Sequence, residues 1–344
     1  MGERPSTERQ ALPGTGLLPD LTVDFPAYLE AKFAIDSASL NRELYAMFCD
    51  HLKNKVDPRV LDLGTGTGAM LRRFLSLNLQ GRVHLVGLDQ DQENLIAASE
   101  RTEKALRGSG FRVQGTKLDG RMTRIRAGKP NVELRIDLLW GDLLDWRKIE
   151  QIEEHTFDCI TAHAFMDLMP LKSALAGIRH LLKSDGLFYS TLNYDGQTVF
   201  LPQYGEPGIE QRLLHVYNRS MEDRRTRGKK TGGCLSGRRL YQALIEEGWT
   251  ILGMGSSDWN LFPSGGQYSA EEKLFLVSIL NMIARQALEE LSPRATAGGV
   301  RSGFVDEKTL ADWYRRRIEA VQSARLALVV HQLDMLAEPA FTVR

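Results

Sequence analysis

Apolar residues along the chain follow two alternating patterns. Short runs rich in β-branched and aromatic residues predict strands buried on both faces, at 59–63, 83–89, 133–140, 157–162, 187–193, 249–255 and 326–336. Elsewhere apolar residues recur every three or four positions, which predicts helices over 24–54, 92–106, 171–182, 207–223, 237–248, 270–291 and 306–322. Because strand and helix alternate up to residue 193, we expect an α/β fold with a doubly wound, mostly parallel sheet.

The alternation changes after residue 193, where two long segments separate the later strands. These segments predict insertions into a single α/β core. The expected parts are a disordered tail (1–20), N-terminal helices (21–56), the core (57–193), a first insertion (194–236), a core helix and strand (237–256), helices of a second insertion (257–323), and a last core strand and tail (324–344).

Composition narrows the class of protein. The 344 residues carry 44 basic and 44 acidic side chains, and this balance argues against nucleic acid or an anionic membrane as the main partner. No apolar run approaches the roughly 18 residues of a membrane span, and the polar first residues do not resemble a signal peptide. Cys49, Cys159 and Cys234 are widely spaced, so we expect no disulfide framework, no metal site and a cytoplasmic location.

The strongest chemical signal is the sequence Asp62-Leu63-Gly64-Thr65-Gly66-Thr67-Gly68. It follows a predicted strand and opens a predicted helix, where glycines let the backbone turn sharply and approach a ligand. Asp89 ends the next predicted strand, and a carboxylate at that position can accept hydrogen bonds from a ribose diol. A turn residue at the end of a strand is the alternative interpretation of Asp89.

At these residues the chain resembles the class I S-adenosylmethionine (SAM)-dependent methyltransferases. The resemblance covers about 57–195 and includes the turn Leu182-Lys183-Ser184-Asp185-Gly186 before the fifth strand. It implies a Rossmann-like sheet of seven strands, the last two an antiparallel hairpin near 249–256 and 324–332. It also implies a set of cofactor-binding residues: Asp62, Gly64, Thr65, Gly66, Thr67, Gly68, Asp89, Gln90, Gly141, Asp142, Leu143, Ala162 and His163.

Other cofactor and substrate classes fit less well. The alternating glycines differ from the G-x-G-x-x-G of dinucleotide-binding folds, since Gly68 falls one residue early. The chain lacks the Asn-Pro-Pro-Tyr or Asp-Pro-Pro-Tyr segment, the Pro-Cys pair and the paired-glutamate loop that would resemble base, cytosine and protein-arginine methyltransferases. We therefore expect in-line transfer of the SAM methyl group to an O or N atom of a small molecule. A SAM-binding regulatory or scaffold protein is the alternative, and a nucleic-acid enzyme is a third.

The insertions follow strands five and six, where ligands bind in open α/β sheets, so we expect a helical cap over a small substrate. Packing or homodimer formation by these helices is the alternative. His163 is the candidate general base, because its ordinary pKa suits deprotonation near neutral pH. Candidate substrate contacts are chosen by position: Asp167, Asn193, Tyr194, Tyr204, His215, Trp259 and Tyr268. The basic segments 108–133 and 224–230 are either surface loops or anion sites.

Overall fold

The computed structural model describes residues 17–77, 79–206, 208–291 and 305–340. They divide into two compact units. The sheet unit consists of Lys32–Val199, Met221–Asn260 and Val329–Arg344, and the helical unit of Met1–Ala31, Phe200–Ser220 and Leu261–Leu328. Of the predicted tail 1–20, residues 1–16 lie outside the described residues, and Leu18 is buried.

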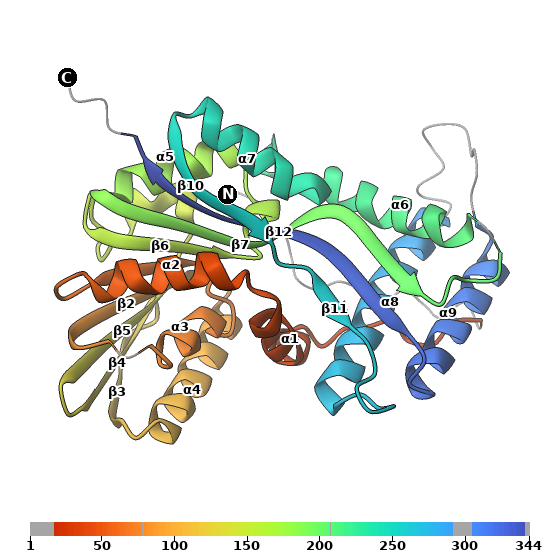
Figure 1. Cartoon of the computed structure of the whole chain (residues 1–344), viewed down its shortest axis with the longest axis horizontal. Helices are drawn as coiled ribbons and strands as arrows, with labels where there is room; N and C mark the ends of the chain where they lie inside the picture. Colours follow the sequence, from red (N-terminus) through yellow and green to blue (C-terminus); the bar gives the residue numbers. More distant parts are fainter. Residues whose placement is uncertain (1–16, 78, 207, 292–304, 341–344) are drawn as a thin grey trace. The chain divides into compact units, whose positions relative to one another are not determined.

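The central sheet has the predicted doubly wound architecture (Figure 1). Among the described residues its strands run in the order β10-β12-β7-β6-β1-β2-β5-β4-β3, with β11 paired to β12. Their bounds are β1 Arg59–Leu63, β2 Gly81–Asp89, β3 Arg112–Asp119, β4 Met122–Lys129, β5 Val132–Trp140, β6 Phe157–His163, β7 Leu182–Leu201, β10 Trp249–Ser256, β11 Trp259–Leu261 and β12 Ala327–Pro339. The pairs β1–β2, β1–β6, β2–β5 and β6–β7 are parallel, whereas β10 and β12 are antiparallel as predicted.

Helices cover both faces of the sheet because successive residues of each buried strand point to opposite sides. Val60 belongs to the apolar core under α2 (Arg42–Lys53), α3 (Ala69–Phe74) and α4 (Gln92–Gly108). Leu61 belongs to the core under α5 (Leu171–Leu181) and α7 (Ser236–Glu246). Figure 1 shows the two helix layers on either side of the strands. This arrangement explains why the core strands read as continuous apolar runs.

The count of seven strands is wrong, because the described sheet contains ten. The basic segment 108–133 contributes β3 and β4, a hairpin that pairs antiparallel with β5 and extends the sheet. Its sequence alternates in period two: Ile125 and Ala127 are buried, and Arg126 between them is exposed. The strand pattern was missed in the sequence because basic residues lie between the apolar positions. Arg124 donates to Asp137 of the neighbouring strand at 2.6 Å.

The turn predicted at Leu182–Gly186 lies inside β7 as an irregularity. Along β6 the register advances from Phe157 to Cys159, while along β7 it advances from Leu182 to Leu187. The intervening residues therefore bulge out of the ladder before the strand resumes. The predicted turn therefore corresponds to a bulge within β7.

The helical unit has a core of its own. It contains α8 (Ala270–Leu291), α9 (Glu307–Gln322), most of α6 (Ile209–Glu222) and the start of α1 (Phe25–Ser39). Trp313 is fully buried, its Nε1 donates to Glu210 at 2.9 Å, and its ring meets Phe200 edge-on. Arg317 also binds Glu210, at 2.6 Å.

The three helices predicted in the insertions are present, and their role as a cap stays a prediction. No helix in the described part of the chain is long and apolar enough to span a membrane.

Candidate cofactor site

The glycine-rich turn joins β1 to α3 at the carboxyl edge of the parallel strands. Gly64, Gly66 and Gly68 have φ angles of +62°, +53° and +81°, a region that other residues enter only with strain. A Cβ on Gly64 would also lie 2.3 Å from Cδ2 of Phe165. Backbone conformation therefore favours glycine at all three positions, and close packing against Phe165 also requires it at Gly64.

Asp62 holds the turn from beneath. Its buried carboxylate accepts hydrogen bonds from the hydroxyls of Thr65 and Thr161, each at 2.7 Å. Burial raises its pKa to about 6, and the two hydrogen bonds oppose that shift. Since one oxygen accepts a bond from the turn and the other from β6, Asp62 shapes the turn rather than facing a ligand. Thr65 and Thr67 are buried with it.

Asp89 ends β2 beside the same turn. Its carboxylate accepts hydrogen bonds from the backbone N–H groups of Gly66 at 2.8 Å and Asp91 at 2.9 Å. Burial raises its pKa, and these hydrogen bonds oppose the shift. The Asp89 carbonyl accepts from the N–H of Gly141 at 2.9 Å, which ties the end of β5 to the end of β2. The next residue, Gln90, accepts from Trp140 Nε1 at 2.8 Å.

Asp142 caps the 3₁₀ helix η1 (Leu143–Lys148) and also forms an ion pair. One oxygen accepts from the N–H of Leu144 at 2.8 Å, and the other from Arg227 at 2.6 Å. Arg227 binds Asp145 as well, at 2.7 Å. The basic segment 224–230 forms a hairpin of β8 (Arg225–Thr226) and β9 (Lys229–Lys230) with Arg227 at its tip. From the sequence, this segment was either a surface loop or an anion site. In the structure, the guanidinium of Arg227 at the tip of the hairpin pairs with two carboxylates of the protein, those of Asp142 and Asp145.

His163, at the end of β6, belongs to a buried network whose other members include four residues absent from the sequence-based site: Lys32, Asp36, Arg73 and Thr191. Its Nδ1 lies 2.6 Å from Thr191 Oγ1, and its Nε2 lies 3.2 Å from both Asp36 and Arg73. Asp36 also accepts from Lys32 Nζ at 2.6 Å and from Trp259 Nε1 at 2.9 Å. Two weak signals for these groups were present in the sequence. Lys32 and Asp36 are four residues apart on α1, and Arg73 lies among apolar residues of α3.

The network fixes the protonation states of its members. Burial and the charge of Arg73 lower the pKa of His163 to about 4, so its imidazole is neutral near pH 7. Burial works against ionisation of Asp36, but Lys32, His163 and Arg73 together lower its pKa to about 2. Two cations and one carboxylate thus surround a neutral histidine whose ring nitrogens both have partners.

The remaining predicted residues have structural contacts of their own. Asn193 donates to the Leu333 carbonyl at 2.8 Å, and Tyr194 bonds Thr198 at 3.0 Å. Asp167 pairs with Arg224 at 3.3 Å. Ala162 and Leu143 are buried core residues. Three candidates belong to the helical unit: Tyr204 donates to Asp312 at 2.8 Å, Tyr268 donates to the Leu326 carbonyl, and His215 is exposed on α6.

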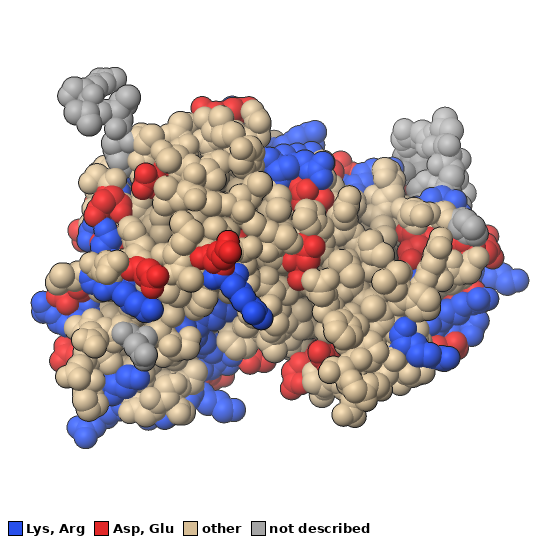
Figure 2. Space-filling view, viewed as in Figure 1, with Lys and Arg blue, Asp and Glu red and all other residues tan. Residues whose placement is uncertain are grey.

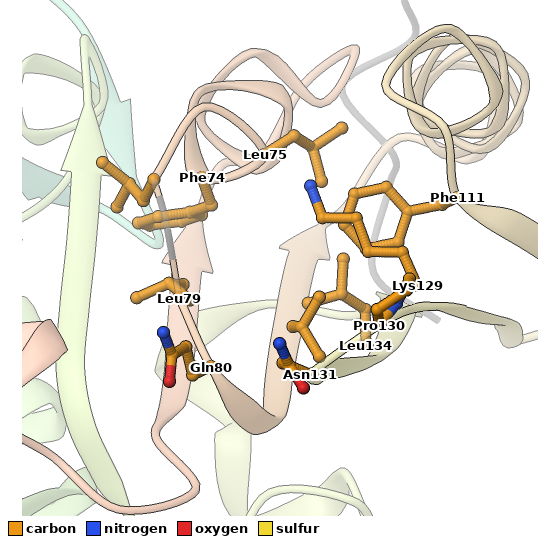
Figure 3. Close-up of a pocket in the computed structure, with 11 residues that line it drawn as sticks. Phe74, Leu75, Leu79, Gln80, Phe111, Lys129, Pro130, Asn131 and Leu134 are labelled. Carbon is orange, nitrogen blue, oxygen red and sulfur yellow. The ribbon is translucent and has the colours of Figure 1, made fainter.

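A cavity of about 310 Å³ lies elsewhere in the sheet unit (Figure 3). Phe74, Phe111 and Leu134 contribute to its apolar wall, and Lys129 and Asn131 are exposed at it. Leu79 and Asn131 precede β2 and β5, so this cavity is at the amino ends of the strands. The glycine turn and Asp89 are at the carboxyl ends. The cavity is therefore not part of the candidate cofactor site.

Comparison with known proteins finds a match over part of the core. Residues 61–188 match the family model described as a methyltransferase domain. A search of curated proteins finds no match. Among solved structures, a geranyl diphosphate C-methyltransferase from Streptomyces coelicolor A3(2) is 13% identical over 86% of this chain and 80% of its own, with a TM-score of 0.37.

Two further structures are similar at the same level. A SAM-dependent methyltransferase from Thiobacillus denitrificans, in complex with S-adenosyl-L-homocysteine, is 13% identical over 90% of this chain and 98% of its own, with a TM-score of 0.41. Phosphoethanolamine N-methyltransferase 2 of Haemonchus contortus is 14% identical over 87% of this chain and 52% of its own, with a TM-score of 0.37. These likenesses are too weak to transfer a substrate. The match over 61–188 shows a methyltransferase domain in that part of the chain, and the motifs within it are those by which the sequence resembles the class I SAM-dependent methyltransferases.

Proposed function

We propose that this methyltransferase transfers the methyl group to an O or N atom of a small molecule, and that SAM binds along the carboxyl edge of β1, β2 and β5. The observation that carries the proposal is the convergence of the glycine turn, Asp89 and Asp142 on that edge. SAM supplies an electrophilic methyl group on a sulfonium.

The residues at this edge fit the parts of SAM. Asp89 offers carboxylate lone pairs to the ribose hydroxyls while it holds the turn through Gly66. Asp142 and the backbone of Leu143 lie where the adenine is expected. Lys32 and Arg73 supply two buried cations against the single carboxylate of Asp36, which suits the carboxylate of a methionyl group.

We infer that His163 is a positioning residue rather than the general base proposed from sequence. Its Nδ1 is bonded to Thr191, and its Nε2 contacts Asp36 and Arg73. A general base must present a free lone pair to the proton it removes. His163 instead keeps Asp36 and Arg73 in place, and Asp36 in turn fixes Lys32. An acceptor that arrives unprotonated requires no base for in-line displacement.

The distribution of charge supports a small substrate over a nucleic acid. Basic and acidic side chains are interspersed on the face in Figure 2, and the whole chain has equal numbers of both. Binding to a phosphate backbone calls for a basic patch or stripe. At the tip of the basic hairpin, Arg227 is already paired with Asp142 and Asp145.

The test is a transfer assay with labelled SAM against a metabolite extract, with parallel samples of RNA, DNA and protein. We expect label in a small molecule, with a product mass one methylene heavier, and loss of labelling in Asp89→Ala. Label only in macromolecules would overturn the choice of substrate. SAM binding without label in any fraction would support a regulatory or scaffold protein.

A further inference from the structure

Two histidines and a glutamate converge on the surface of the sheet unit, away from the cofactor edge. Glu154 and His155 lie in the turn before β6, and His180 lies in the last turn of α5. The ligand atoms of these three exposed side chains all lie within 4.8 Å of one another. We propose that Glu154, His155 and His180 bind one divalent transition-metal ion of the Zn²⁺ class. This proposal is independent of the methyltransferase activity.

The backbone holds the two histidines together before any ion binds. The N–H of His155 donates to the His180 carbonyl at 2.9 Å, and the N–H of Thr156 donates to the Leu181 carbonyl at 3.1 Å. His155 has a φ of +53°, which is uncommon outside glycine, so this turn has a specific conformation. Bringing the ligands into position therefore requires side-chain rotation only.

The hydrogen bond of His155 prepares it as a ligand. Its Nδ1 lies 3.0 Å from the Leu182 carbonyl, and a carbonyl can only accept. Nδ1 therefore carries the proton, and the lone pair of the neutral ring is on Nε2. Metal-binding histidines commonly have this arrangement, in which the second ring nitrogen donates to a backbone carbonyl or a carboxylate.

The charges around the three side chains, and the kinds of ligand atom they offer, favour binding of a cation at this site. The carbonyl end of α5 favours positive charge, and Glu153, next to Glu154 in the sequence, adds a carboxylate. Arg147 opposes the ion, because it contacts Glu154 at 3.3 Å. Two imidazoles and one carboxylate form a set that Zn²⁺ accepts, with room for water as a further ligand. Around Zn²⁺, such atoms lie about 3.4 Å apart, so the exposed side chains must close by at most about 1.4 Å.

The histidine spacing showed no metal motif, since His155 and His180 are separated by β6 and most of α5. Only the parallel pairing of β6 with β7 brings the start of β6 to the end of α5. The expectation of no metal site came from the sequence alone and is replaced by this proposal.

The first experiment titrates tag-free, EDTA-treated full-length protein with Zn²⁺ by calorimetry. We expect one ion per chain, and roughly tenfold or greater weakening in His155→Ala, His180→Ala and Glu154→Gln. The matched control is Glu153→Gln, the adjacent carboxylate outside the triad, which should bind as the wild type does. Arg147→Gln should bind Zn²⁺ more tightly because it frees Glu154. Equal weakening in Glu153→Gln, or unchanged binding in both histidine variants, would overturn the site.

A second measurement locates the ion. The ring of Trp146 has its centroid 6.3 Å from that of His180, so Cu²⁺ at the site should quench its fluorescence. Trp146→Phe should abolish the saturable quenching while Zn²⁺ still binds. Circular dichroism and unchanged binding of S-adenosylhomocysteine would show that each variant is folded. Saturable quenching that persists in Trp146→Phe would place the ion elsewhere and refute the proposal.

Discussion

Asp89 has two proposed roles, binding the ribose and holding the glycine turn, which separate measurements on one variant can distinguish. Asp89→Ala removes the proposed ribose acceptor and also frees the N–H groups of Gly66 and Asp91. Hydrogen bonds to a charged group contribute about 1.5–3 kcal/mol, so we expect SAM affinity to fall roughly 10- to 150-fold. Loss of the turn contacts should also lower the free energy of unfolding by about 1–3 kcal/mol.

Calorimetry with S-adenosylhomocysteine and urea unfolding would measure these two effects. Asp57→Asn is the control, because Asp57 pairs with Arg82 at the amino end of β2. A stability loss in Asp89→Ala without any change in affinity would show that Asp89 only shapes the turn. In that case another group holds the ribose.

His163 leads to a prediction about pH. An unfolded histidine has a pKa of about 6.5, whereas burial and Arg73 lower the folded value to about 4. As pH falls through this window, the unfolded chain takes up a proton that the folded chain excludes, so stability falls by up to about 3 kcal/mol. Asp62 acts in the opposite sense. Burial raises its pKa from 3.8 to about 6, so it contributes stability as pH falls through that range.

Because the two groups oppose each other, the wild-type profile alone is uninformative. The difference in unfolding free energy between wild type and His163→Gln isolates the histidine. We expect this difference to move in favour of the variant as pH falls from 6.5 to 4, as measured by urea unfolding at several pH values. A difference that stays constant over that range would mean that His163 titrates alike in both states.

At the scale of elements, the contact between the glycine turn and the segment after β6 is testable. Gly64→Ala should destabilise the fold, since left-handed φ costs a non-glycine residue about 1–2 kcal/mol and the new Cβ meets Phe165. Phe165→Ala in the same chain should recover the steric part and leave the backbone strain. A double-mutant cycle on unfolding free energy measures this coupling. Additive effects would show that Phe165 moves aside without cost.

Sequence patterns predicted elements where one physical signal dominates. Strands β1, β2, β5, β6 and the core of β7 are buried on both faces, so their apolar runs were visible. The β3–β4 hairpin was missed because a charged residue, Arg126, occupies the exposed position between Ile125 and Ala127. Within the site, the glycine turn and Asp89 could be located from local sequence. The partners Asp36 and Arg73 could not, because they meet His163 only through the tertiary fold.

At the scale of the whole molecule, each of the two units has its own core. The proposed cofactor residues Asp62, Asp89, Asp142 and His163 all belong to the sheet unit, whereas the fully buried Trp313 belongs to the helical unit. Trp313→Ala removes a large core side chain and one of the two hydrogen-bond partners of Glu210 named above, a change that typically costs about 3–5 kcal/mol.

We therefore expect calorimetric unfolding to separate into two transitions with different responses. S-adenosylhomocysteine at a hundred times its dissociation constant stabilises the state that binds it by about 2.7 kcal/mol. For a unit of 150–250 residues this corresponds to roughly 5–10 °C in Tm. The ligand should raise the transition of the sheet unit, and Trp313→Ala should lower the other. The ligand's effect on the sheet unit should persist in the variant, because the groups proposed to bind it are unchanged. A single transition that both changes move would show that the two units unfold as one cooperative body.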